Sequence, residues 1–443
     1  MLFIIVFLLI ILLATGDGSL VSLIIGCSMY IGAAVVVAII QRENYKVSLK
    51  LYNIVFMVYV TFAFIVSCSF SKTDYFLVSD PSRYLDFFLN STYVSWQKDA
   101  IVRCYLEFTD SNALYNAYLN NIAVYANNSL EGITVYGFTL CHTIWGVLSS
   151  VVLYRILTRR FNERKAFNLA LVFAFCSLFM FYSTVIIRDI IICFFYLVAF
   201  DIVDQKFTMS GIVKLLVLIL IVWGIRLYSG LFLITFLCYY IYKKLYNSSL
   251  RHMATFVFAT ILISVSGFIL ASDIVTQTMD EIQLYTELTA DRSAGGMVSK
   301  LQSLPLGLSH LSIFFFMMIG PLPPFNGYIG VETFSHFWMS TMRFVAGFFW
   351  FVLFYSLFYK LFLKKYISQI PFDKIVLLLV CLLFMLANTS HPDIRRMLPV
   401  FPILFVQYAE ICKTENSTLF GCKISRNLMI FYMIMAFGML VIM

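Results

Sequence analysis

Long apolar runs, separated by short polar segments, recur along the whole chain. The runs 20–40 (LVSLIIGCSMYIGAAVVVAII) and 167–187 (FNLALVFAFCSLFMFYSTVII) are each as long as a transmembrane helix, because roughly twenty residues of α-helix cross the 30 Å hydrocarbon core. Their apolar residues do not share one helix face, as they would in an amphipathic helix of a soluble protein. The pattern therefore predicts an all-α polytopic integral membrane protein.

The positions of the basic residues predict the topology. Lysine and arginine gather in six short loops, which the positive-inside rule assigns to the cytoplasm together with the N-terminus. The apolar run 2–14 lacks a basic n-region, so we expect a retained first helix rather than a cleaved signal peptide. This reading gives about 13 transmembrane helices in a single domain, 1–443. The six loops are 41–50, 155–165, 204–214, 243–252, 360–374 and 413–426.

Two longer segments have the opposite charge bias. Residues 71–132 contain four basic and seven acidic side chains, and residues 272–304 contain two basic and five acidic ones. We therefore predict two periplasmic loops, at 71–132 and 272–336. The apolar stretch 311–325 (LSIFFFMMIGPLPPF) is short and contains three prolines, so we predict a re-entrant segment there, which is tolerated where it lines a cavity.

Composition narrows the function classes. The chain is 61% hydrophobic and 12% charged, and its net charge of +8 is not gathered on one soluble face, so no nucleic-acid partner is expected. Ten cysteines are scattered without metal-ligand spacing, and no metal or cofactor is expected. A P-loop, GxGxxG, HExxH and a DxD in a soluble domain are all absent, which disfavours nucleotide hydrolysis, dinucleotide chemistry and metal-bound nucleotide-sugar transfer.

Five basic residues outside the loops fall at the predicted outer ends of helices, and all five are arginine. A planar guanidinium suits phosphate, so this one-sided set predicts a phosphorylated ligand on the outer face. The alternative is that arginines at helix ends reach the headgroups and anchor the helices, and we expect this role for Arg343. The candidate phosphate-binding residues are Arg188, Arg226, Arg395 and Arg396, joined by Arg292 of the second periplasmic loop.

The segment HPDIRRML combines a helix break with several polar side chains. Pro392 breaks the helix at residues 391–396, and Pro399 and Pro402 disturb the start of the next one. His391 is the first candidate for a catalytic base, because an ordinary imidazole titrates near pKa 6.5, although a structural hydrogen bond is an equal alternative. Asp393 and Asp189 are rival bases, and either carboxylate is alternatively a charge partner of its neighbouring arginine.

The first periplasmic loop contains a second polar element, SDPSRYLDFF. Carboxylates beside aromatic rings suit sugar hydroxyls and ring faces, so Asp80, Arg83 and Tyr84 are candidate substrate-binding residues. A capped amphipathic helix has the same pattern, and this alternative stays open.

Together these stretches resemble the bacterial O-antigen and capsule repeat-unit polymerases of the Wzy type, in particular the EpsG-like branch. The resembling stretches are SDPSRYLDFF, IIRD, PLGLSH with GPLPPF, and HPDIRRMLPVFP. The resemblance implies a GT-C-like fold and a metal-independent, inverting glycosyltransferase of lipopolysaccharide biosynthesis. EpsG-like chains tend to have a neutral or amide residue after the equivalent arginine, so Asp189 departs from their pattern and its role stays open.

The implied reaction moves a growing glycan from undecaprenyl pyrophosphate to the next lipid-linked repeat unit, at the periplasmic face of the inner membrane. Besides the lipid-linked oligosaccharide and the bilayer, implied partners are a Wzz-type chain-length regulator and a flippase. A lipid-linked oligosaccharide flippase or another transporter is the alternative from a different class. Internal repeats, charges near the midplane and short outer loops are typical of transporters, and the long outer loops here favour the enzyme. An O-antigen ligase has the same sequence pattern as a polymerase.

Overall fold

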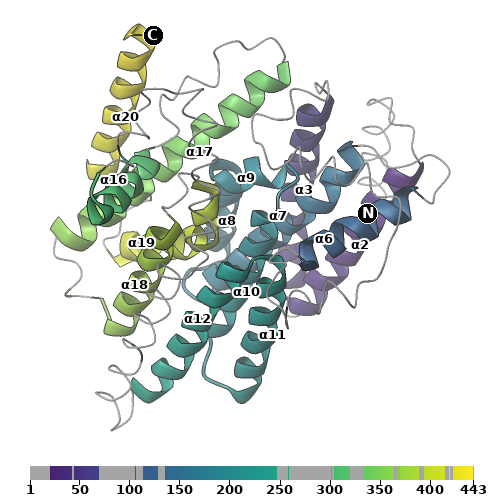
Figure 1. Ribbon diagram of the computed structural model, residues 1–443, viewed down its shortest axis with the longest axis horizontal. Coiled ribbons are helices and arrows are strands. Elements are labelled where there is room, and N and C mark those ends of the chain that lie inside the picture. Colours follow the sequence, from purple (N-terminus) through teal and green to yellow (C-terminus); the bar gives the residue numbers. More distant parts are fainter. Residues whose placement is uncertain are drawn as a thin grey trace.

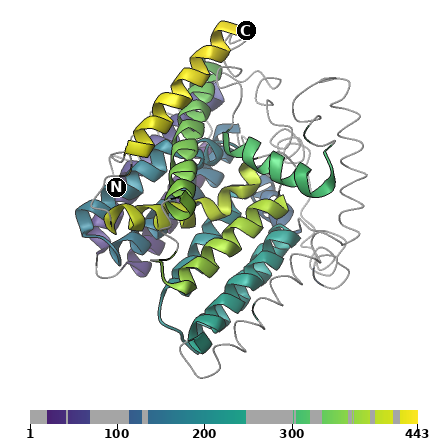
Figure 2. The same ribbon diagram turned by 90° about the vertical axis from the view of Figure 1, so that its left-hand side faces the viewer.

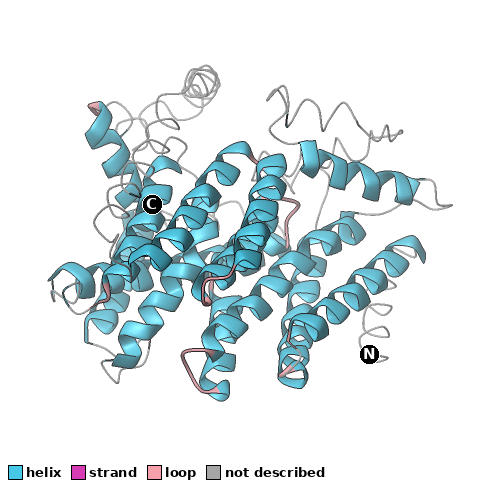
Figure 3. Ribbon diagram, turned by 90° about the horizontal axis from the view of Figure 1, so that it is seen from below, coloured by secondary structure: helices cyan, strands magenta, loops and turns pink. Residues whose placement is uncertain are grey.

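The structure is a computed structural model of the 443-residue chain. Within its described residues every regular element is a helix and no strand occurs, which confirms the predicted all-α class (Figure 3). The described residues are 20–41, 44–68, 105, 113–127, 135–246, 258, 301, 304–319, 334–363, 368, 370–388, 394–414, 419 and 423–442.

Most of the helices form one bundle around a shared apolar core, and the C-terminal helix packs on it through a smaller separate cluster (Figure 1). In chain order they are α2 (Leu20–Ile40), α3 (Tyr45–Cys68), α6 (Ala113–Asn127), α7 (Val135–Thr158), α8 (Glu163–Cys176), α9 (Leu178–Ser183), α10 (Asp189–Asp204), α11 (Met209–Ile225), α12 (Leu227–Tyr246), α16 (Leu306–Ile319), α17 (Phe334–Phe358), the π-helical turn η3 (Tyr359–Leu363), α18 (Phe372–Ala387), the 3₁₀-helix η6 (Ile394–Val400), α19 (Phe401–Thr414) and α20 (Lys423–Ile442).

Three of the described helices are long and apolar enough to cross a membrane. They cover Tyr45–Val66, Thr139–Thr158 and Phe337–Phe362, and two shorter apolar helices cover Ile24–Ile40 and Met209–Ile225. In a bilayer such helices satisfy all their backbone hydrogen bonds internally. The all-helical, apolar architecture is consistent with a membrane protein, whereas the total of about 13 spans and the GT-C-like topology stay predictions.

Helix α7 lies at the centre and packs against α2, α3, α8 and α10. Helix α10 in turn packs against α11, α12 and η6, so it connects the N-terminal and C-terminal halves of the bundle. Helix α20 packs against α17 at the periphery, beside the C-terminus (Figure 2). The side chains on the outer faces of α2, α11 and α20 include many exposed aliphatic residues, as a lipid-facing surface requires.

Several apolar runs that look continuous in the sequence are broken helices. The run 167–187 divides into α8 and α9 at Ser177, whose backbone is extended (φ −98°, ψ 166°) and whose Oγ accepts a hydrogen bond from the Phe179 N–H at 3.2 Å. The serine thus ends one helix and caps the next. Hydropathy alone cannot detect such a break, because every residue around Ser177 is apolar.

The predicted re-entrant stretch is described only in part. Its first residues belong to α16, whose 14 residues span about 21 Å, less than the hydrocarbon core. The residues 320–333 lie outside the described part of the chain. The re-entrant course of 311–325 therefore stays a prediction.

Candidate functional site

Four sequence-predicted residues meet at the N-terminal end of α10. Asp189 is only 1% exposed, and its Oδ1 accepts a hydrogen bond from Arg226 Nη1 at 2.6 Å. Its charge also interacts with the guanidinium groups of Arg395 and Arg188. We call these four residues the outer cluster, because the sequence predicts them at the outer ends of helices.

Helix α10 positions the first two members. Arg188 occupies its N-cap with helical backbone angles (φ −66°, ψ −24°) and no side-chain capping bond, and Asp189 is the first helical residue. A carboxylate in the first turn is stabilised by the positive end of the helix dipole. Part of the stabilisation of the Asp189 carboxylate therefore comes from the helix itself.

Arg226 has an unusual position, because it is the one residue between α11 and α12. Its backbone is extended (φ −160°, ψ 113°), and its N–H still donates to the Val222 carbonyl at 2.8 Å. The two helices approach so closely beyond this joint that a Cβ on Gly230 would lie 2.6 Å from the Cα of Trp223. The joint therefore fixes the Arg226 backbone, and its side chain, 10% exposed, reaches back to α10.

The 3₁₀-helix η6 supplies the third arginine. Of the predicted helix break at 391–396, residues 391–393 lie outside the described residues, and 394–396 belong to η6 rather than to an α-helix. The 3₁₀-helix packs against α10, and Arg395 is 7% exposed. Pro399 lies inside η6 and Pro402 in the first turn of α19, where a missing N–H is tolerated. Seven residues are long for a 3₁₀-helix, a form that often marks a functional hinge.

The other two predicted outer arginines lie differently. Arg396 is next to Arg395 on η6 and is half-buried. The Arg343 guanidinium lies over the Phe181 ring, 5.5 Å from its centroid, in a cation–π contact between α17 and α9. Such a contact accords with the predicted anchoring role of Arg343.

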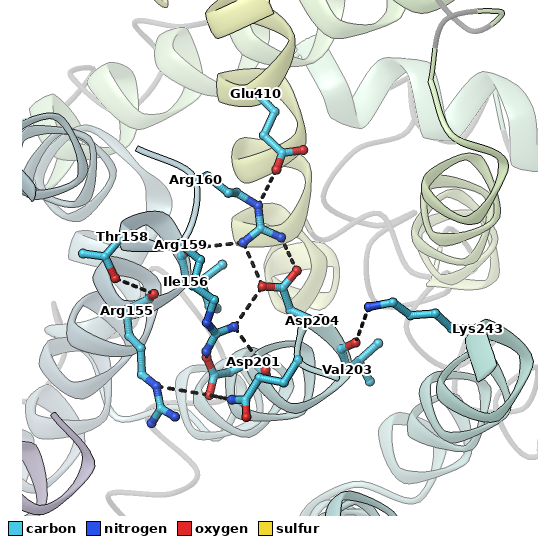
Figure 4. Close-up of polar contacts among 11 residues, drawn as sticks. Arg155, Ile156, Thr158, Arg159, Arg160, Asp201, Val203, Asp204, Lys243 and Glu410 are labelled. Carbon is cyan, nitrogen blue, oxygen red and sulfur yellow. Dashed lines mark hydrogen bonds and ion pairs between the residues drawn. The ribbon is translucent and has the colours of Figure 1, made fainter. Parts of the chain in front are cut away.

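The opposite end of α10 holds a second set of ion pairs, which the sequence analysis did not predict (Figure 4). Arg159 and Arg160, after α7, both pair with Asp204, the Arg159 Nη1 at 2.8 Å from its Oδ2. Arg159 also pairs with Asp201, and the Arg155 Nε lies 3.6 Å from Asp201 Oδ2. Asp201 and Asp204 are one helical turn apart, a spacing that could have indicated a shared face.

Glu410 of α19 extends this set across the bundle. It accepts a hydrogen bond from Arg160 Nε, and the Lys374 Nζ lies 2.5 Å from its Oε2. Burial raises the pKa of Asp204, but the Arg160 and Arg159 guanidinium groups outweigh burial and hold the pKa below its ordinary value. We call these ion pairs of α7, α10, α18 and α19 the inner network.

Residues from all six predicted cytoplasmic loops or their flanks make contacts near the inner network. The predicted topology requires the six loops to lie at the same end of the bundle. That this end faces the cytoplasm stays a prediction. The contacts are Arg155 Nη1 to the Ile40 carbonyl at 3.4 Å, Lys50 over the Phe167 ring, Lys243 Nζ to the Val203 carbonyl at 3.3 Å, Lys413 over the Phe161 ring, and the Lys374–Glu410 and Arg160–Asp204 pairs.

The sequence did not predict a further polar contact, because one of its two partners belongs to the predicted periplasmic loop 71–132. Helix α6, from the loop 71–132, packs against α7 and α11, and its Tyr115 hydroxyl lies 3.0 Å from Nε2 of the fully buried His142. The neighbouring Tyr118 hydroxyl donates to the Cys141 carbonyl at 2.8 Å. These bonds fix α6 on the bundle, as expected of buried polar groups.

The remaining predicted site residues, Asp80, Arg83, Tyr84, Arg292, His391 and Asp393, lie outside the described residues. Within the described part, no three His, Cys, Asp or Glu side chains are placed to hold a metal ion. The outer cluster has the chemistry of an anion site, because several planar guanidinium groups converge in a buried setting where charge–charge interactions are strong. No protein-family model, curated protein or solved structure matches the chain.

Proposed function

We propose that this protein is a GT-C-like glycosyltransferase that polymerises a bacterial surface polysaccharide such as O-antigen. It transfers a growing glycan from undecaprenyl pyrophosphate to the next lipid-linked repeat unit, at the periplasmic face of the inner membrane. The observation that supports this proposal is the outer cluster. The charges of Arg188 and Arg395, which are far apart in the sequence, both interact electrostatically with one buried carboxylate, Asp189.

A buried group of arginines suits the pyrophosphate of a lipid-linked donor. Arginine binds phosphate oxygens through paired N–H donors, and such charge-assisted hydrogen bonds are about twice as strong as neutral ones. In the outer cluster Asp189 already accepts such a bond from Arg226 at 2.6 Å. A second oxyanion, the pyrophosphate, would bind through the same donor type and would be stabilised further as it leaves.

The neighbourhood of the outer cluster fits an outward-facing site. A Cβ on Gly224, two residues before Arg226, would lie 2.4 Å from Leu114 Cδ1 of α6, so the predicted periplasmic loop 71–132 packs close to the cluster. The predicted cytoplasmic side chains of the inner network lie at the other end of α10. Both observations agree with a ligand that reaches the cluster from the periplasmic side.

In the proposed reaction, the acceptor hydroxyl oxygen bonds to the anomeric carbon of the donor glycan. The bond from that carbon to the pyrophosphate oxygen breaks, and the leaving pyrophosphate keeps the electron pair. The arginines stabilise the charge on the leaving group, and a base takes the hydroxyl proton. No metal enters this scheme.

The base proposed for this step is His391, with Asp393 and Asp189 as rivals. His391 lies three residues before η6, which holds Arg395 against α10. His391→Gln keeps hydrogen bonding but cannot accept the proton, so polymer is expected to disappear while membrane insertion stays normal. Long chains made by His391→Gln would exclude the histidine as base and leave the two aspartates.

The proposal is tested by deleting the gene and separating the surface polysaccharide on a gel. A polymerase mutant is expected to retain single repeat units on the lipid core, whereas a flippase or ligase mutant has none. Complementation with Arg226→Lys, which keeps the charge but loses the planar fork, is expected to leave single units as well. Single units in the deletion strain and long chains with Arg226→Lys would support the polymerase but refute the phosphate site.

A further inference from the structure

The carboxylate of Asp189 is a buried member of the outer cluster. The side chain is 1% exposed, and only one of its oxygens, Oδ1, is bonded to Arg226. The other oxygen, Oδ2, is buried and accepts no hydrogen bond from the described residues. A fixed negative charge is thus built into a site whose proposed ligand is itself an anion.

Such a charge acts differently on the two forms of a lipid pyrophosphate. In the donor, both ends of the pyrophosphate are esterified, one by the lipid and one by the glycan, so it carries two negative charges. After transfer the terminal phosphate is free, and its second ionisation, with a pKa near 6, brings the total to about three at neutral pH. The additional charge is repelled by a nearby carboxylate in a medium of low dielectric constant.

We propose that Asp189 is a specificity-determining residue, whose negative charge reduces the affinity of the outer cluster for a pyrophosphate with a free terminal phosphate more than for one esterified at both ends. The inference rests on the proposed function, because that function supplies lipid pyrophosphate as the ligand. It gives Asp189 a role besides pairing with Arg226, because the spent lipid pyrophosphate is bound less tightly than it would be without the carboxylate.

The test is a binding measurement on the purified full-length protein, with two probes that differ only in the terminal phosphate. The probes are farnesyl pyrophosphate and its methyl ester at the terminal phosphate. The wild-type protein is expected to bind both probes, and the ratio of their two dissociation constants is the reference. In Asp189→Asn the ratio of the two dissociation constants is expected to shift about tenfold towards farnesyl pyrophosphate, equivalent to about 1.4 kcal/mol. Asparagine keeps an oxygen acceptor for Arg226, so the fold is preserved.

Asp204→Asn is the matched control, because it makes the same change in an aspartate–arginine pair at the other end of α10. It is expected to leave the ratio at the wild-type value. The inference is overturned if wild type binds neither probe, or if Asp189→Asn leaves the ratio of the two dissociation constants unchanged. The polysaccharide gel tests the proposed function separately, since a chain that is no polymerase can still show the charge preference.

Discussion

The two ends of α10 hold the same kinds of side chain in different arrangements. At the C-terminal end, Asp201, Asp204 and Glu410 each pair with at least one arginine or lysine from another helix. At the N-terminal end, among the described residues, the Asp189 carboxylate bonds to Arg226 and interacts electrostatically with Arg188 and Arg395. The ends lie about 22 Å apart along the helix, given its 1.5 Å rise per residue.

The difference agrees with a structural role for the inner network and with the binding role proposed for the outer cluster. In the inner network, acids and bases from α7, α10, α18 and α19 compensate one another, so the network joins helices without requiring a ligand. In the outer cluster, Arg226 bonds to the Asp189 carboxylate, and other arginines interact with it electrostatically. The cluster lies where α10 begins, where α11 ends before α12, and where the chain forms the 3₁₀-helix η6. Arginine content alone does not distinguish the two ends; within the part of the chain that the structure describes, the positions of the carboxylates do.

The largest effect on stability is expected from Asp204→Ala in the inner network. Removing this carboxylate leaves the partly buried Arg159 and Arg160 without their shared partner, and truncating one member of a buried ion pair costs about 3–5 kcal/mol. The midpoint of thermal unfolding in detergent is expected to fall clearly, and less in Asp204→Asn, which keeps an acceptor. An unchanged midpoint in Asp204→Ala would show that the inner network does not stabilise the bundle.

An intermediate effect is expected from Gly230→Ala, which changes the outer end without removing a charge. The new Cβ would lie 2.6 Å from the Trp223 Cα, so α11 and α12 must separate at about 1–3 kcal/mol, and Arg226 moves with their joint. Shorter polysaccharide chains are expected on the gel. The control is Gly32→Ala, since nothing lies within 4 Å of a Cβ there; equal chain lengths in the two variants would contradict the placement of Arg226 by the joint.

The smallest effect is expected from Arg343→Lys. Lysine keeps a cation over the Phe181 ring, and a cation–π contact of this kind contributes about 0.5–1 kcal/mol at an exposed site. The gel is expected to show chains of wild-type length, in contrast to Arg395→Lys, where the planar fork is lost. If both variants lose long chains equally, Arg343 belongs to the outer cluster.

The sequence predicted some features of the bundle and missed others, for identifiable reasons. It placed Arg188, Arg226 and Arg395 at one end of the helices, and the structure brings them together on Asp189. It treated 167–187 as one span, whereas Ser177 divides it, because a serine among apolar residues does not change the hydropathy. It also treated Arg159 and Arg160 as solvated loop residues, and the structure pairs both with α10.

The sequence by itself determined the all-helical, apolar class of the molecule, and it predicted the side of each charge. Apolar length fixes which segments are helices of membrane dimensions, and charge placement follows from the cost of leaving water, which depends on each segment alone. Only the tertiary structure decided which charges meet. Asp189 and Asp204 are both aspartates beside arginines, but one shares the outer cluster and the other closes the inner network. That difference depends on contacts between residues such as Arg160 and Glu410, which are 250 positions apart and approach only when α7 packs near α19.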